Sequence, residues 1–193
     1  MLSDAAARKG LCVAVDVCYP SSGGARAAMV GSPDQGFSSV VAERVVVVAE
    51  VKPYRSGEFY LRELPAIRAV LRSSGDPGHD ELVGPGQLGE AAGIALIVVD
   101  GYVELDPHGR PGLGAHVRAE FGVPVIGVAK SAFATAAHAV PVRRGASARP
   151  LFVTAAGLPA LDAASIVQQM AGRFRLPDAL RLVDALARGA RER

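Results

Sequence analysis

Residues 94–101 read Ile-Ala-Leu-Ile-Val-Val-Asp-Gly, a continuous apolar run that ends in an aspartate and a glycine. Such a run is typical of a central strand whose two faces are both buried. A carboxylate at the end of an apolar strand is costly to desolvate unless it is paired or binds a cation. Asp100 is therefore a candidate functional residue as well as the end of a strand.

Two further carboxylates occupy comparable positions. Asp16 lies in the alternating segment Cys-Val-Ala-Val-Asp-Val-Cys-Tyr (12–19), and Glu63 falls in the first turns of a helix predicted from about residue 60 to 73. Three converging carboxylates would form a site for a hard divalent cation, which we expect to be Mg²⁺, with Mn²⁺ as a substitute. A site of this kind predicts phosphodiester hydrolysis.

The other elements follow from hydrophobic periodicity and turn residues. Three successive strands predict an antiparallel meander, after which a helix and then parallel-type strands and helices follow. The predicted strands span residues 11–18, 25–31, 44–52, 94–100, 123–129, 139–143 and 150–154. The predicted helices span residues 60–73, 113–121, 161–173 and 177–190, and residues 74–90 are predicted as a loop with a short helical piece possible near 86–92. This order predicts an α/β fold with a ribonuclease H-like mixed sheet, in which the first and fourth strands lie side by side.

Length and composition indicate a soluble globular protein. The chain has 193 residues, of which 50% are hydrophobic, and a formal net charge of +2, so we expect one domain over residues 1–193 and favour a monomer. A nearly neutral total neither requires nor excludes a nucleic-acid partner. The N-terminal residues lack the apolar core of a signal peptide, and no run approaches the ~18 apolar residues that span a bilayer. We therefore expect a cytoplasmic protein without membrane contact.

The two cysteines, Cys12 and Cys18, lie on one predicted strand. Six residues of strand separate them by roughly 20 Å, which is too far for a disulfide bond. Their side chains share one face, because side chains alternate with a period of two. Reduced, partly buried thiols fit a cytoplasmic protein.

Several short segments recur in an order that belongs to one known family. They are Val-Asp-Val-Cys-Tyr (15–19), Pro-Tyr with Gly and Leu-Arg-Glu (53–63), Val-Val-Asp-Gly (98–101) with Gly-Leu-Gly-Ala-His (112–116), Ile-Gly-Val-Ala-Lys-Ser (126–131), and Arg-Leu-Pro-Asp-Ala-Leu-Arg-Leu (175–182). Together they resemble the endonuclease V family, metal-dependent nucleases that cut DNA or RNA near deaminated adenine (inosine). The resemblance covers roughly residues 11–187.

The resemblance implies a role for individual residues. Asp16, Glu63 and Asp100 match the family's metal-binding and catalytic carboxylates, which hold cations that activate water and stabilise the leaving oxygen. Lys130 matches a lysine near the scissile phosphate, where its point charge would contact a phosphate oxygen. The implied products carry a 3′-hydroxyl and a 5′-phosphate.

The segment at 53–63 implies a wedge that enters the nucleic acid. Tyr54 matches a tyrosine inserted beside the extruded base, and Gly57 matches a glycine of the same loop, so both are candidate substrate-binding residues. A planar aromatic ring can fill the gap that a base leaves in the stack, partly offsetting an unstacking cost of a few kcal/mol.

The loop after Asp100 departs from the family pattern Asp-Gly-(Gln/Asn)-Gly-x-x-His. It reads Asp-Gly-Tyr-Val-Glu-Leu-Asp (100–106), so Val103 stands in place of the glycine and Asp106 in place of the histidine. The valine adds branched bulk where a base would otherwise approach closely. Asp106 is a candidate for metal or substrate binding, and His108 is an alternative for the part of the histidine. These departures concern inosine specificity more than metal chemistry.

The sequence thus predicts a Mg²⁺-dependent endonuclease that acts on nucleic acid near deaminated purines, in DNA repair or RNA processing. Two alternatives stay open: a nuclease of the same fold with another substrate, and a nucleic-acid-binding protein that has lost catalysis. We interpret His116 mainly as a polar contact in the interior. Arg143 and Arg144 form a small basic spot that either contacts phosphate or is solvated surface.

Overall fold

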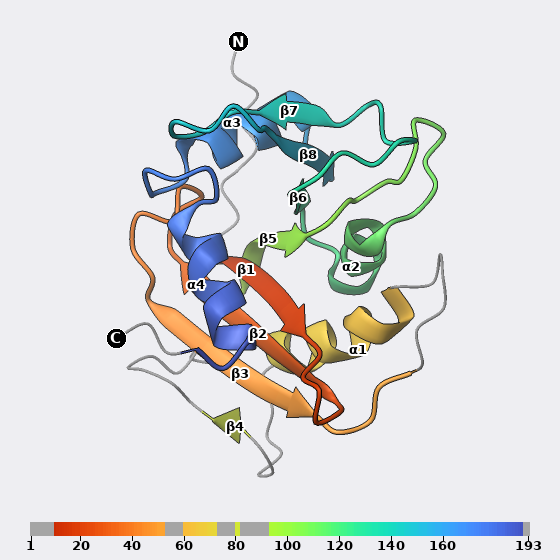
Figure 1. The fold of residues 1–193 in the computed structure, drawn as a ribbon, viewed down its shortest axis with the longest axis vertical. Coiled ribbons are helices and arrows are strands. Elements are labelled where there is room, and N and C mark those ends of the chain that lie inside the picture. The colour runs from red at the N-terminus through yellow and green to blue at the C-terminus, as the bar shows by residue number, and fades with distance from the viewer. Residues whose placement is uncertain (1–9, 53–59, 73–79, 82–92, 191–193) are drawn as a thin grey trace.

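The computed structural model describes residues 10–52, 60–72, 80–81 and 93–190. Figure 1 shows a twisted central sheet with helices packed against it. The strands are β1 (Leu11–Cys18), β2 (Ala25–Ser32), β3 (Ala42–Val48), β4 (Asp80–Glu81), β5 (Ile94–Asp100), β6 (Val125–Ala129), β7 (Val140–Val142) and β8 (Leu151–Ala156). The helices are α1 (Tyr60–Leu71), α2 (Leu113–Phe121), α3 (Ala160–Gln169) and α4 (Asp178–Ala187).

The eight strands form one mixed sheet in the order β4-β3-β2-β1-β5-β6-β8-β7. Strands β1, β2 and β3 pair antiparallel, which confirms the predicted meander. Strand β5 lies parallel to β1 and to β6, while β8 runs antiparallel to β6 and β7. The ribonuclease H-like arrangement is therefore confirmed, and the buried run at 94–100 is a central strand.

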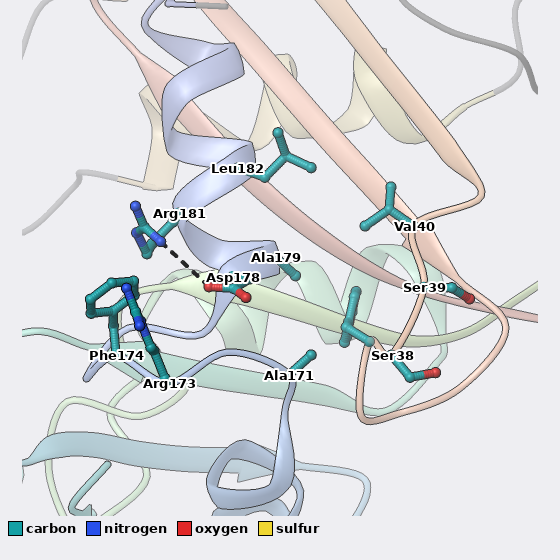
Figure 2. A pocket seen from close by; sticks show the side chains of 11 residues that line it. Ser38, Ser39, Val40, Ala171, Arg173, Phe174, Asp178, Ala179, Arg181 and Leu182 are labelled. Carbon is teal, nitrogen blue, oxygen red and sulfur yellow. Dashed lines mark hydrogen bonds and ion pairs between the residues drawn. The ribbon is translucent and has the colours of Figure 1, made fainter. Parts of the chain in front are cut away.

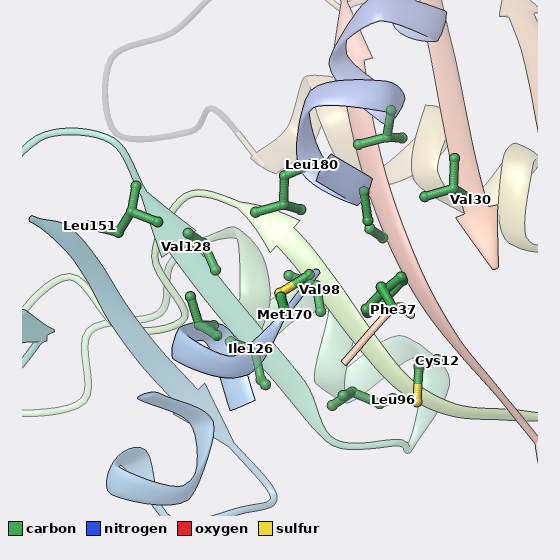
Figure 3. Packing of buried hydrophobic residues seen from close by; sticks show 14 of the residues in the cluster. Cys12, Val30, Phe37, Leu96, Val98, Ile126, Val128, Leu151, Met170 and Leu180 are labelled. Atoms are coloured by element: carbon green, nitrogen blue, oxygen red, sulfur yellow. The ribbon is translucent and has the colours of Figure 1, made fainter. Parts of the chain in front are cut away.

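Each face of the sheet is covered by a different pair of helices. Alternate strand residues such as Ala14, Val98 and Val128 form one hydrophobic core with α3 and α4, part of which is drawn in Figure 3. The intervening residues, such as Val15 and Val99, form a second core with α1 and α2. The period of two along each strand therefore decides which pair of helices a side chain meets.

The two cysteines are free thiols on one face of β1, as predicted. Cys12 is buried in the core beneath α3 and α4, and Cys18 packs partly buried against the same core. No helix in the described part of the chain is long and apolar enough to cross a membrane.

The ends of β3 and α3 and the presence of β4 are the main differences from the predictions. Strand β3 ends at Val48, four residues before the predicted end, and the two-residue strand β4 lies where a loop was predicted. Helix α3 ends at Gln169 because Met170 adopts an extended ψ of 146° and Gly172 a φ of +105°. A left-handed glycine cannot continue the helix, so the predicted end at residue 173 is wrong.

The end of α3 is held by Arg144, which is buried rather than solvated. Its guanidinium donates to five backbone carbonyls, those of Gln168, Met170, Ala171, Gly172 and Phe174. The carbonyls at the end of a helix lack partners within the helix, and a buried carbonyl without a donor is costly. Arg144 therefore fixes the path of the chain between α3 and α4, and its interpretation as surface is wrong.

Candidate active site

Strand pairing brings two of the predicted carboxylates together. Val15 pairs with Val99 between the parallel strands β1 and β5, so that Asp16 and Asp100, the next residues, lie beside each other. Both follow the alternation that points Ala14 and Val98 toward α4. Lys130, directly after β6, continues the same alternation from Val128.

Helix α1 supplies the third predicted carboxylate. Glu63 lies in its first turn, on the face that buries Ala66 and Ile67 against the sheet, and only 7% of Glu63 is exposed. Residues three and four apart share a helix face, so packing of the apolar pair carries Glu63 inward. Asp16, Glu63, Asp100 and Lys130 all line one cleft of about 610 Å³.

Two carboxylates in this cleft, Asp16 and Glu63, resist ionisation. Burial, followed by the charge of Asp100, raises the pKa of Asp16 to about 6. Burial, followed by the charges of Asp16 and Asp100, raises the pKa of Glu63 to about 9. Leu176, Leu180 and Val183 line a small space together with Asp16 and contribute to the burial of Asp16. A cation placed among these groups would relieve both the desolvation and the repulsion.

Lys130 lies directly against the carboxylates. Its Nζ is 2.6 Å from Asp100 Oδ2 and 3.7 Å from Asp184 Oδ1. Burial alone would lower the pKa of Lys130, but the hydrogen bond to Asp100 and the charges of Asp100, Asp184 and Asp16 outweigh it and raise the pKa. Lys130 is therefore a fixed ammonium charge at the edge of the cleft.

A fourth carboxylate, Asp184 on α4, was missed from the sequence. It lines the same cleft, and Arg188 Nε is 2.9 Å from its Oδ2. Burial acts to raise the pKa of Asp184, but the hydrogen bond from Arg188 and the charge of Lys130 lower it. One signal was present: Asp184 follows Leu180 by four residues and Val183 by one, so it continues the apolar stripe of α4.

Two tyrosines complete the walls of the cleft. The Tyr102 hydroxyl donates to the carbonyl of Ser131 at 2.8 Å and accepts from the Phe133 amide at 3.0 Å, which ties the loop after β5 to the loop after β6. The Arg62 guanidinium lies 4.1 Å from the ring centroid of Tyr19. Burial and the nearby Glu63 raise the pKa of Tyr19, so its hydroxyl stays protonated.

Val103 does not project into the cleft. It is fully buried, its amide donates to Thr154 Oγ1 at 2.8 Å, and it belongs to the core under α1 and α2. A Cβ on Gly114 would lie only 2.6 Å from Val103 Cγ2, so a glycine on α2 makes room for the valine. The Val103 side chain, which was expected to lie beside a bound base, is therefore directed into the core.

The remaining candidates lie apart from the four carboxylates or outside the described residues. Asp106 Oδ1 accepts from the amides of His108 at 2.8 Å and Arg110 at 3.2 Å, and Asp106 is not among the described residues that line the cleft. Its part in substrate binding stays a prediction. Tyr54 and Gly57 lie outside the described residues.

His116 makes an aromatic contact rather than a polar one. Its ring stacks on Tyr60 with a centroid distance of 3.6 Å and an interplanar angle of 10°. Burial lowers the pKa of His116, which keeps the imidazole neutral near pH 7. His116 is only partly buried, and its partner is a ring rather than the interior polar contact that was predicted.

The chemistry of the cleft fits a hard divalent cation. Its donors are the carboxylate oxygens of Asp16, Glu63, Asp100 and Asp184, which are the ligands that Mg²⁺ and Mn²⁺ take in proteins. Within the described residues, no three His, Cys, Asp or Glu side chains are gathered closely enough to be a ready-made metal site. Lys130 supplies positive charge between Asp100 and Asp184 instead.

An acidic cleft at the ends of neighbouring parallel strands in a ribonuclease H-like sheet is the arrangement of a nuclease site. The family profile described as Endonuclease V matches residues 2–157. The chain is 31% identical over 202 residues to Endonuclease V of Streptomyces coelicolor, covering 94% of this chain and 79% of that one. It is 30% identical over 200 residues to Endonuclease V of Azotobacter vinelandii, covering 92% and 82%. The chain belongs to the endonuclease V family.

Solved structures agree with this assignment. The crystal structure of Endonuclease V from Streptomyces avermitilis matches with a TM-score of 0.69 at 26% identity, covering 94% of this chain and 81% of that one. Ciona intestinalis Endonuclease V (D234N), in complex with a 23mer DNA containing an inosine, shares the fold with a TM-score of 0.67 at 16% identity, covering 93% and 84%.

Proposed function

We propose that this protein is a divalent-metal-dependent endonuclease that hydrolyses a phosphodiester bond of DNA or RNA near an inosine. The observation that carries the proposal is the convergence of Asp16, Glu63, Asp100 and Asp184 with Lys130 in one cleft. Membership of the endonuclease V family and the inosine-containing DNA bound by the Ciona relative support the substrate class. A role in DNA repair or RNA processing follows from that substrate. We further propose that residues 1–193 act as one domain and as a monomer.

The carboxylates would hold the metal, with Mg²⁺ the proposed ion and Mn²⁺ a substitute. Asp16 and Asp100 lie side by side on the sheet, Glu63 comes from α1 and Asp184 from α4, so the donors surround the cleft from three directions. A bound divalent cation would lower the pKa of the attacking water and stabilise charge on the leaving oxygen. The raised pKa values of Asp16 and Glu63 mean that these carboxylates release protons as they become ligands.

Lys130 would bind the phosphate of the substrate. Its ammonium now contacts Asp100 and approaches Asp184, while 41% of its side chain remains exposed to the cleft. An ammonium in this position can donate to a non-bridging phosphate oxygen and stabilise the charge that builds there. The hydrogen bonds of Tyr102 to the loop after β6 hold that strand end in place.

Cleavage of matched oligonucleotides tests the proposal. DNA and RNA strands with and without one inosine are incubated with Mg²⁺, Mn²⁺ or EDTA, using wild type, Asp16→Ala and Asp100→Ala. Glu120→Gln is the matched control, because Glu120 pairs with Arg68 and Arg72 away from the cleft. We expect inosine-dependent cutting that needs metal and both aspartates. Cutting indifferent to inosine would favour a nuclease with another substrate, and binding without any cutting would favour a protein that has lost catalysis.

A further inference from the structure

A second pocket, of about 630 Å³, lies between the β2–β3 loop and the start of α4 (Figure 2). Ser38, Ser39 and Val40 form one wall, and Phe174 and Arg181 contribute to the other. None of the four carboxylates of the active site lines it. The function proposed above leaves this pocket without a role.

The pocket combines an exposed aromatic ring with two guanidinium groups that lie over it. The Phe174 side chain is half-exposed at 45%, and the guanidinium carbons of Arg173 and Arg181 lie 5.0 Å and 4.7 Å from its ring centroid. Asp178 pairs with Arg181 at 3.4 Å. The charged residues that line the pocket are Arg173, Arg181 and Asp178, so its lining has a formal charge of +1. An exposed aromatic ring flanked by arginines can stack a nucleobase and bind its phosphates.

Helix α4 connects this pocket to the active site. Arg181 borders the pocket, and Arg188 lines the carboxylate cleft. Seven residues make about two helical turns, so the two arginines share one side of α4 and are separated by about 10 Å along its axis. At about 3.4 Å per nucleotide of a stacked strand, that distance corresponds to roughly three nucleotides.

The chain beside Phe174 is also hydrogen-bonded to the end of β6, where Lys130 lies. Arg175 Nη2 donates to the carbonyl of Lys130 and, at 2.8 Å, to the carbonyl of Pro150. Arg144 holds the carbonyl of Phe174 itself at 3.2 Å. The backbone that carries the ring is therefore held in a defined position relative to the cleft, as a surface that fixes the register of a strand requires.

We propose that Arg173, Phe174 and Arg181, which we name the Phe174 ledge, bind the nucleic-acid strand that flanks the scissile phosphate. One base takes the place of a guanidinium group over the exposed ring and stacks there, and the phosphates next to it contact the two arginines. The ledge deepens the proposed function and rests on it, since the active site supplies the reason for a nucleic-acid ligand. Along α4, Arg181 of the ledge lies about 10 Å, or roughly three stacked nucleotides, from Arg188 at the cleft.

Binding of fluorescein-labelled inosine oligonucleotides, measured by anisotropy in EDTA, tests the ledge without cleavage. We expect Phe174→Leu to weaken binding roughly 5-fold or more, because a stacked base is lost. Arg181→Gln should reduce the salt dependence of binding by about 0.7 to 0.9 in the logarithmic slope. Leu161→Ala, at an exposed apolar residue, and Arg72→Gln, at an exposed arginine, are the matched controls and should bind like wild type.

Photocrosslinking locates the contact. A 5-iodouracil is placed at each position within six nucleotides of the inosine, and we expect one crosslinked position in wild type that Phe174→Leu loses. The ledge alone would be overturned if the wild-type protein cuts inosine substrates but Phe174→Leu and Arg181→Gln leave binding, salt slope and crosslinks unchanged. Wild type that never cuts but loses affinity through Phe174→Leu would overturn the nuclease and keep the ledge.

Discussion

Replacing Glu63 by glutamine should stabilise the metal-free protein at neutral pH. Glu63 is buried, and its pKa rises from 4.5 to about 9 on folding. Between those two values the folded chain holds a proton that the unfolded chain has released, so the free energy of unfolding falls as pH rises. Glutamine fills the same space and needs no proton.

The size of the gain follows from the pKa difference. Each pH unit between 4.5 and about 9 costs wild type about 1.4 kcal/mol. At pH 7, about 2.5 units above the unfolded pKa, Glu63→Gln should therefore raise the free energy of unfolding by up to about 3 kcal/mol. Near pH 4.5 the two proteins should be equally stable. With divalent metal, wild type should be more stable than Glu63→Gln, because a metal ion needs Glu63 ionised and binds more tightly as pH rises.

Urea unfolding in EDTA at pH 5, 6, 7 and 8, repeated with saturating Mg²⁺, measures both effects. Glu120→Gln is the control of opposite sign: hydrogen bonds from Arg68 lower the pKa of Glu120, so its stabilisation is present at neutral pH and lost on acidification. That control should lose a little stability at pH 7 relative to wild type, and this loss should disappear on acidification. A Glu63→Gln protein less stable than wild type at pH 7, or equally stable at every pH, would refute the reasoning.

Three further substitutions test the metal ligands, the chain between α3 and α4, and the packing around Val103. Asp184→Asn should raise the Mg²⁺ concentration needed for half-maximal cutting by roughly 10- to 100-fold, measured by metal titration of cleavage. Arg144→Met should lower the free energy of unfolding by about 2–4 kcal/mol in urea, because four carbonyls lose the donor that Arg144 provides, while that of Ala171 keeps the Asp178 amide. Gly114→Ala should cost about 1–3 kcal/mol, since its Cβ would meet Val103 Cγ2 at 2.6 Å, and Val103→Ala in the same chain should recover part of that loss.

Each of these has a result that contradicts it. An unchanged metal titration would remove Asp184 from the ligand set. Wild-type stability of Arg144→Met would mean that water satisfies the carbonyls between α3 and α4. Strictly additive losses in the Gly114 and Val103 double variant would show that the two side chains do not compete for one space.

Much of the fold could be predicted because local sequence patterns specify the individual strands and helices. The apolar run of β5 and the alternation of β1 are visible in single segments, and the order of elements predicted their adjacency, confirmed by the Val15–Val99 pairing. The two-residue strand β4 could not be predicted, because so short a strand carries no periodicity of its own. The end of α3 depends on Arg144, which lies 24 residues before Gln168 and binds its carbonyl only in the folded chain.

Some residues of the candidate site could likewise be predicted from the sequence, and others could not. Asp16, Glu63, Asp100 and Lys130 stand out in the sequence because each interrupts or ends an apolar element, and the structure gathers them in one cleft. Asp184 reads as an ordinary helical acid until α4 packs across β1. Asp106 reads as a candidate, yet its carboxylate closes a turn in the loop after β5.

The sequence by itself determined the elements, the meander and the residue types able to hold a metal, because periodicity and the cost of isolated charges act over a few residues. Only the tertiary structure decided which charges meet, how far burial shifts them, and that Val103 turns into the core beside Gly114. The physical reason is distance: desolvation and Coulomb energy depend on every group within a few ångströms, and most of those groups are remote along the chain.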